Sequence, residues 1–181
     1  MIIINEKTKT SKSNDINIYT DGSAINNQSK DKSKTLAGVG VFFGDNDKRN
    51  ISFSLNNTKY KRTNQVAELL AIIMGIQKLI ETELIGKRII TIYTDSMYCI
   101  NVYSKWAKNW EKNNWKKSNN RPVENLELVK KMYYLATNLK VRMVHVRSHK
   151  NEPEKKTLEY ERWYGNMMAD KLAVKASLKT N

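Results

Sequence analysis

The sequence lacks the features that would place it in a membrane or outside the cell. It has a single cysteine, Cys99, so no internal disulfide can form and a reducing compartment is predicted. The apolar opening, residues 1–4, is too short for a signal peptide, and the mean hydropathy of -0.65 argues against membrane spans. We therefore expect a cytoplasmic protein with no membrane partner, in which Cys99 is buried on a helix.

Acidic residues are also scarce. Only 18 Asp and Glu stand against 32 Lys and Arg, which gives a formal net charge of +14. Such a chain is expected to bind a polyanion, although a lysine-rich surface on any soluble protein would give the same balance. Charge alone therefore indicates nucleic acid as a partner without establishing it.

What the sequence does contain is the pattern of one α/β domain behind a flexible tail. The length of 181 residues suits one domain, and residues 1–15 are polar and without periodicity. Three strands that pair antiparallel are predicted at 16–19, 37–43 and 51–55, with a hairpin turn at 44–47.

The period then changes from that of strands to that of helices. Apolar residues at three- and four-residue spacing predict a long helix from 64 to near 86, and a buried parallel strand at 89–93 follows. Further helices are expected after Ser96 and Asn125, then a strand at 141–146 and a last helix from about 166 to 178. This order predicts a mixed five-stranded sheet, with strands 1–3 antiparallel and strands 4–5 parallel, flanked by helices.

Four carboxylates stand at informative places in this scheme. Asp21 and Asp95 end predicted strands, Glu68 lies one turn into the long helix, and Asp170 lies on the last helix. Each alone also fits a turn former or a partner of the helix dipole. Together they can converge at the carboxyl ends of strands, where oxygen ligands would hold two Mg²⁺ ions about 4 Å apart for phosphodiester hydrolysis.

The segments around these carboxylates resemble one known family. The runs 20–23, 63–69 and 93–96, with Trp106, Trp110, Trp115, His149 and 165–170, make the stretch from about Ile16 to Leu178 similar to type 1 ribonuclease H. The resemblance implies the ribonuclease H-like fold and an endonuclease that hydrolyses the RNA strand of RNA/DNA hybrids. It also implies RNA ends with a 5'-phosphate and a 3'-hydroxyl, and a role in removing RNA primers or hybrids during replication.

The same resemblance implies the cofactor and the catalytic residues. Asp21, Glu68, Asp95 and Asp170 would hold two Mg²⁺ ions, for which Mn²⁺ can substitute, and His149 would assist proton transfer or product release from a loop. The other histidine, His145, is assigned to packing or to the surface.

It further implies which residues hold the hybrid. Asn64, Gln65 and Asn27 would read 2'-hydroxyls and base edges of the RNA strand, although Asn64 also fits a helix N-cap. Lys61, Thr63 and Asn125 match a phosphate pocket for the DNA strand. Trp106, Trp110 and Ser118 match a channel for deoxyribose on a basic handle, residues 105–121, where Trp115 is expected to pack the handle helix. A tryptophan row at this spacing could instead belong to the core.

Two departures from the family pattern complete the picture. An insertion at 150–164 is expected to form a solvated loop or a short helix, and could act as a lid or as an added hybrid contact. No separate hybrid-binding domain is recognisable before Ile16, and a monomer is expected.

Two alternative functions remain open. The chain could be a catalytically inactive nucleic-acid-binding module on this fold, or another nuclease of the superfamily such as a junction resolvase.

Overall fold

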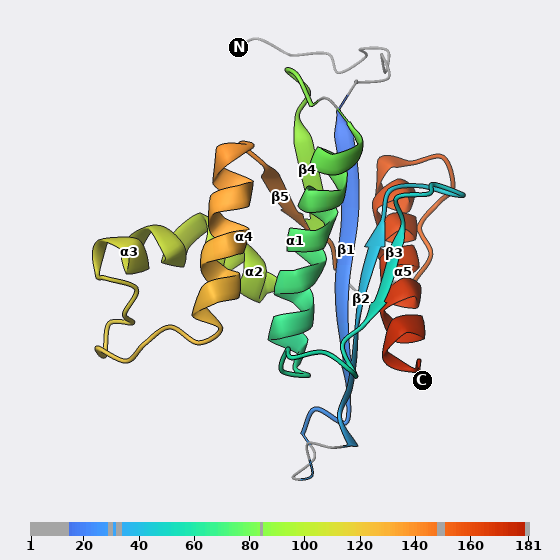
Figure 1. Ribbon diagram of the computed structural model, residues 1–181. Coiled ribbons are helices and arrows are strands. Elements are labelled where there is room, and N and C mark those ends of the chain that lie inside the picture. Colours follow the sequence, from blue (N-terminus) through green and yellow to red (C-terminus); the bar gives the residue numbers. More distant parts are fainter. Residues whose placement is uncertain (1–14, 29–30, 32–33, 84, 148–150, 180–181) are drawn as a thin grey trace.

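The protein is a three-layer structure in which one sheet lies between helices. The computed structural model describes residues 15–28, 31, 34–83, 85–147 and 151–179. Helices α1 and α4 lie on one side of the sheet and α5 on the other, while α2 and α3 extend away from it (Figure 1). The predicted tail, apart from residue 15, and His149 fall outside the described residues.

The sheet has five strands in the order β3-β2-β1-β4-β5. Their bounds are β1 Ile16–Ile25, β2 Leu36–Phe42, β3 Ile51–Ser54, β4 Ile90–Thr94 and β5 Arg142–His145. β2 pairs antiparallel with both β1 and β3, whereas β4 pairs parallel with both β1 and β5. The predicted fold class and strand directions are confirmed.

Six helical segments complete the described chain. They are α1 Asn64–Thr82, α2 Met97–Asn101, the π-helical turn η2 Val102–Trp106, α3 Ala107–Lys112, α4 Leu126–Asn138 and α5 Leu158–Ser177. Buried residues occupy most of α1, because this helix packs against the sheet on one side and α4 on the other. Cys99 is fully buried on α2, as predicted. Among the described residues, no helix is both long and apolar enough to span a membrane.

Strand β1 is longer than the sequence pattern predicts. The expected strand stops before Asp21, but β1 stays paired with β2 through Ile25. Its pairing with β4 ends earlier, at Tyr19 opposite Tyr93. The alternation of apolar and polar residues stops because helices cover both faces of β1. Successive residues around Thr20 are therefore all buried, and neither face of the strand is solvent-exposed there. Asp21 therefore lies in mid-strand, where the neighbouring strand has ended.

Helix α5 begins at Leu158, about two turns before the predicted start, so the expected insertion is a loop only in its first half. The side chain of Thr157 caps the helix by accepting a hydrogen bond from the Tyr160 N–H at 3.1 Å. The many charged residues of this segment leave no regular apolar spacing from which a helix could be predicted. The aromatic rings are the signal, because Tyr160 and Tyr164 stack one turn apart, and Tyr164 packs edge-on against Phe42 of β2.

Close packing fixes α5 on the sheet. A side chain on Gly40 of β2 would collide with the carbonyl oxygen of Ala169, and one on Gly38 would collide with the Ala173 carbonyl. Only glycine lets the helix backbone come this near to the strand. The position of Asp170, the next residue after Ala169, is therefore determined by how α5 packs on β2.

Candidate active site

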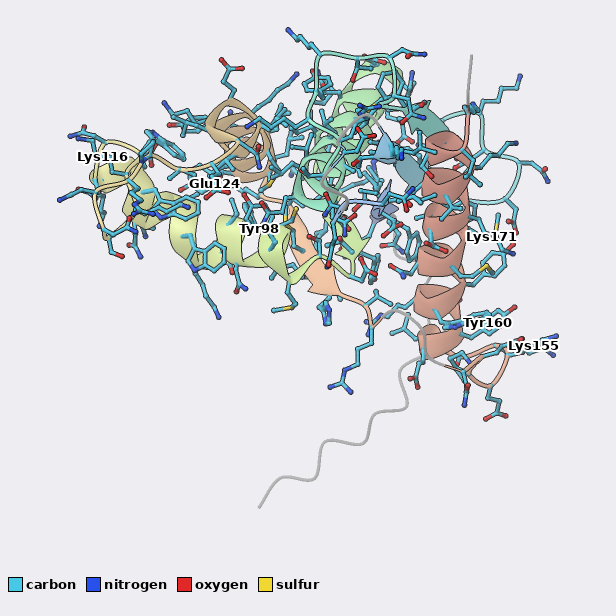
Figure 2. All side chains as sticks on the ribbon, turned by 90° about the horizontal axis from the view of Figure 1, so that it is seen from below. Tyr98, Lys116, Glu124, Lys155, Tyr160 and Lys171 are labelled. Carbon is cyan, nitrogen blue, oxygen red and sulfur yellow. The ribbon has the colours of Figure 1, made fainter. Side chains whose placement is uncertain are left out.

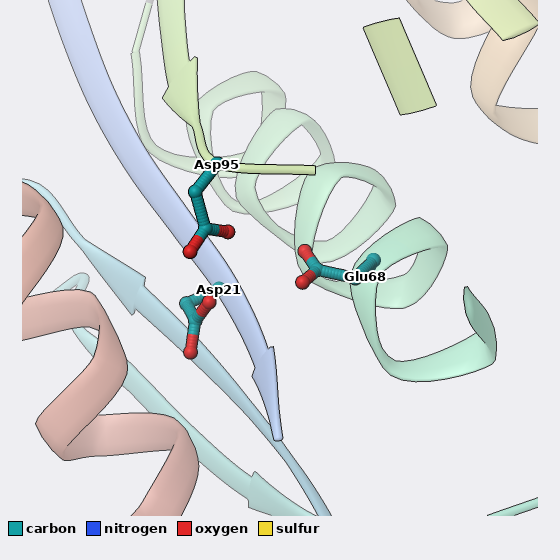
Figure 3. Close-up of side chains that lie close together, drawn as sticks. All are labelled: Asp21, Glu68 and Asp95. Atoms are coloured by element: carbon teal, nitrogen blue, oxygen red, sulfur yellow. The ribbon is translucent and has the colours of Figure 1, made fainter. Parts of the chain in front are cut away.

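Three carboxylates from three separate elements meet at the carboxyl end of β4. Asp21 comes from β1, Asp95 directly follows β4, and Glu68 comes from α1 (Figure 3). One oxygen from each lies within 4.8 Å of the others. The parallel register sets Tyr19 opposite Tyr93, so two residues later Asp21 and Asp95 come side by side on the same face. Glu68 can reach them because Gly22 has no side chain to hold the α1 backbone away.

The cluster is electrostatically unfavourable by itself. Burial, with the charges of Asp95 and Asp170, raises the pKa of Asp21 to about 8. Burial and the charges of Asp21 and Asp95 raise the pKa of Glu68 well above its usual range, and a hydrogen bond from the Gly22 backbone only partly opposes this. The Glu68 Oε2 atom is buried and has no hydrogen-bond partner among the described residues. Clustered carboxylates with an unsatisfied buried oxygen are chemically suited to a divalent cation.

Asp170 lies at the edge of this cluster and outside the group of three. Its side chain is exposed on α5, yet its charge is near enough to raise the pKa of Asp21. The structure thus brings together three of the four predicted metal ligands and places the fourth beside Asp21. His145 is exposed at the end of β5, which agrees with a surface role.

The predicted RNA-reading and phosphate-pocket residues converge on one hollow of about 520 Å³. It is lined by Asn27, Lys61, Thr63, Asn64, Gln65 and Asn125, which are the six residues expected there, together with Glu124. Thr63 is the N-cap of α1 and accepts a hydrogen bond from the Val66 N–H, so the alternative reading of Asn64 as the cap is wrong. Asn64 is an exposed residue in the first turn.

The three channel residues gather on a second groove, of about 700 Å³, on the handle. Trp106, Trp110 and Ser118 line it, as does Gln65, which also lines the first hollow. The rings of Trp106 and Trp110 are 5.7 Å apart, and Trp106 remains 38% exposed. This arrangement excludes the core alternative for Trp106.

Sequence reasoning missed Tyr98 as part of this groove. Its ring lies 6.2 Å from that of Trp106 and lines the same groove. Eight residues of regular α-helix would turn Trp106 about 80° away from Tyr98. The π-helical turn η2 absorbs about one extra residue and so brings both rings onto one face. The spacing alone gives no signal of this, because it requires the irregular turn.

Trp115 has a different role from the other two handle tryptophans. It is 9% exposed and belongs to the main core. Its ring packs edge-on against Tyr133 and Tyr134, and the Lys130 ammonium lies 5.0 Å from the ring centre. Trp115 is thus a packing residue, as expected, but its ring partners lie on α4 and not on the handle helix.

Comparison with known proteins identifies the family. The family model for RNase H matches residues 13–178, nearly all of the chain. The chain belongs to the RNase H family. It is 36% identical over 156 residues to "Ribonuclease H" of Schizosaccharomyces pombe, covering 86% of this chain and 50% of the yeast protein. It is 33% identical to "Ribonuclease H" of Trichodesmium erythraeum, covering 94% of this chain and 93% of that protein.

A solved structure shares the fold. LC9-RNase H1, described as a type 1 RNase H with the type 2 active-site motif, superposes with a TM-score of 0.62 at 22% identity. The match covers 93% of this chain and 74% of LC9-RNase H1. At 22% identity it shows a common fold and nothing about activity. The resemblance to type 1 RNase H is confirmed by the family model and the relatives together. This RNase H spans half the length of its fission-yeast relative.

Proposed function

We propose that this RNase H is an endonuclease that hydrolyses the RNA strand of RNA/DNA hybrids by a two-metal-ion mechanism. The observation that carries the proposal is the convergence of Asp21, Glu68 and Asp95, beside two hollows lined by the nine residues expected to hold a hybrid. The cleaved RNA would carry a 5'-phosphate and a 3'-hydroxyl.

The carboxylates would bind two Mg²⁺ ions, or Mn²⁺ in their place. Asp21, Glu68 and Asp95 supply oxygens from three directions, and Asp170 can approach from α5. When bound, divalent cations stabilise the charge that develops at a phosphodiester during hydrolysis. The protein's part is to hold the carboxylates rigidly, since all of them lie on or next to strands and helices. His149 as a proton-transfer residue stays a prediction.

The two hollows would distinguish the strands of the substrate. Asn64 and Gln65, with Asn27, offer amides that can read the 2'-hydroxyls of RNA in the wide minor groove of an A-like duplex. Lys61, Thr63 and Asn125 would hold a DNA phosphate. Trp106, Trp110 and Ser118 would accept deoxyribose and leave little room for a 2'-hydroxyl. A role in removing RNA primers or hybrids during replication, a cytoplasmic location and a monomeric state remain predictions.

The decisive experiment incubates the purified chain with a labelled RNA/DNA hybrid in Mg²⁺ or Mn²⁺. Matched duplex RNA, duplex DNA and single-stranded RNA serve as other substrates. The Asp95→Asn variant should lose more than about a hundredfold in rate, because even partners of metal ligands cost 10- to 100-fold when removed. Glu154→Gln is the control, since it removes an exposed carboxylate from the loop before α5.

The outcomes separate the alternatives. Cleavage of hybrid RNA alone, lost in Asp95→Asn and kept in Glu154→Gln, supports the proposal. Binding of the hybrid without cleavage in either metal means a nucleic-acid-binding module. Cleavage of branched DNA means a junction resolvase, and cleavage at a single ribonucleotide in duplex DNA means type 2 activity.

A further inference from the structure

A third cleft, of about 360 Å³, lies between the end of β5 and the first turns of α5. One wall comes from the end of β5 and the other from residues 153–163, within the predicted insertion, and the function described above leaves the cleft unused. Its walls include His145, Arg147, Pro153, Leu158, Arg162 and Trp163, with Glu159 as their acidic neighbour.

The chemistry of the cleft fits a nucleotide. Arg147, exposed just beyond β5, and Arg162, on α5, bring two permanent positive charges to a site with one carboxylate, that of Glu159. Guanidinium groups present forked donors that match phosphate oxygens. Trp163 adds a half-buried aromatic surface on which a base or sugar can pack. The cleft thus combines phosphate-binding and base-stacking groups.

Arg162 also shows an unsatisfied donor. Its guanidinium carbon lies 5.7 Å from the centre of the Tyr93 ring, which holds the side chain in place. Its Nε atom is buried and has no hydrogen-bond partner among the described residues. A buried donor without an acceptor is unfavourable, so an anion in the cleft would relieve a cost that the free protein carries.

The cleft is next to the carboxylates. Tyr93 stacks on Tyr19 with ring centres 4.8 Å apart, and these two residues precede Asp95 and Asp21 by two positions each. Two residues along a strand span about 7 Å and return to the same face. Arg162 lies over Tyr93, so it is on the same face of the sheet as the carboxylates and about two strand residues, or about 7 Å, from them along the strands.

The cleft and the two hollows also lie towards opposite sides of the molecule. Figure 2 shows Tyr98 and Glu124, which line those hollows, towards the handle, and Tyr160 of α5 on the far side of the molecule. The hollow and groove on the handle side contain every residue assigned to the DNA strand, besides the three RNA-reading amides, and none of the DNA-strand residues lies on the α5 side. A nucleic-acid segment on the α5 side would belong to the strand that the carboxylates cut.

We infer that this cleft binds a nucleotide of the RNA strand beside the cleavage point, with its phosphate between Arg147 and Arg162 and its base or ribose on Trp163. The inference rests on the proposed function, because it takes the RNA strand as the one cut. It gives the extended α5 a role in substrate binding.

The test measures hybrid binding by the full chain in EDTA, where no cleavage occurs, from 50 to 300 mM salt. One lost phosphate contact lowers the slope of log K against log salt by about 0.9, which is about eightfold in affinity at 0.1 M salt. We expect both effects in Arg147→Gln. Arg142→Gln is the matched control, since Arg142 is also exposed but is the first residue of β5, at the end away from the cleft. It should leave slope and affinity unchanged.

A second measurement identifies the strand. Hybrids with 5-bromouracil in either the RNA or the DNA strand are irradiated with the protein, and crosslinked peptides are mapped. Crosslinks at Trp163 should come from the RNA strand. Equal behaviour of Arg147→Gln and Arg142→Gln, or Trp163 crosslinks from the DNA strand alone, overturns the inference while hybrid cleavage stands. Absence of any hybrid cleavage by the wild-type chain refutes the proposed function instead.

Discussion

Replacing Asp21 by Asn should make the metal-free protein more stable, although it removes a predicted ligand. The carboxyl of Asp21 is buried beside Asp95 and Asp170, and these surroundings raise its pKa from 3.8 to about 8. Each unit of pKa shift corresponds to about 1.4 kcal/mol. A rise from 3.8 to about 8 therefore limits the gain in the free energy of unfolding to about 6 kcal/mol above pH 8. We expect roughly 2 kcal/mol, because the amide that replaces the carboxyl is itself buried and its desolvation costs about 1–3 kcal/mol.

The sign of the pH dependence follows from the direction of the shift. Below about pH 4 the carboxyl is protonated in both the folded and the unfolded chain, so it costs nothing. Between pH 4 and 8 the folded state binds more protons than the unfolded state, and the free energy of unfolding falls as pH rises. The stabilising effect of Asp21→Asn should therefore be small at pH 5 and largest at pH 8.5.

Urea unfolding in EDTA at pH 5, 7 and 8.5 measures this effect, with Glu154→Gln as the charge-matched control. Added Mg²⁺ should stabilise the wild type more than Asp21→Asn, because a bound cation stabilises only the folded state that holds it. The reasoning is refuted if Asp21→Asn is no more stable than the wild type at pH 8.5. A gap that stays constant from pH 5 to 8.5 would also refute it, since it would arise from packing rather than charge.

Three further substitutions test the framework around the site. Thr63→Ala removes the hydrogen bond that caps α1 at the Val66 N–H, and should cost about 1 kcal/mol in urea unfolding, whereas Thr63→Ser should cost little. Trp115→Ala should lower the free energy of unfolding by about 3 kcal/mol, since this ring is core; a loss below about 1 kcal/mol would contradict that placement. Gly40→Ala should destabilise by about 2 kcal/mol or more and slow hybrid cleavage, because the added methyl collides with the Ala169 carbonyl and displaces α5; unchanged melting and rate would show that α5 is not seated there.

The sequence by itself determined the order and type of the main elements. Helix α1 was predictable because of its regular apolar period, although its cap is Thr63 and not Asn64, and β4 was predictable because its short apolar run fits a strand with both faces buried. The family was predictable from short segments around Asp21, Glu68 and Asp95. Each of these motifs is a continuous run of residues, so it can be recognised without knowing which segments meet in the fold. The pocket residues followed from the same resemblance.

Only the tertiary structure decided where elements end and which side chains meet. The length of β1 depends on β2 continuing beside it after β4 has stopped, which no local pattern records. The start of α5 depends on aromatic rings finding partners on the sheet, in a segment whose charges suggest a loop. Tyr98 joins the tryptophan groove through an irregular turn. Arg162 becomes a candidate RNA contact because α5 lies over Tyr93. Local sequence thus fixes local conformation, whereas contacts between distant segments arise only when the layers pack.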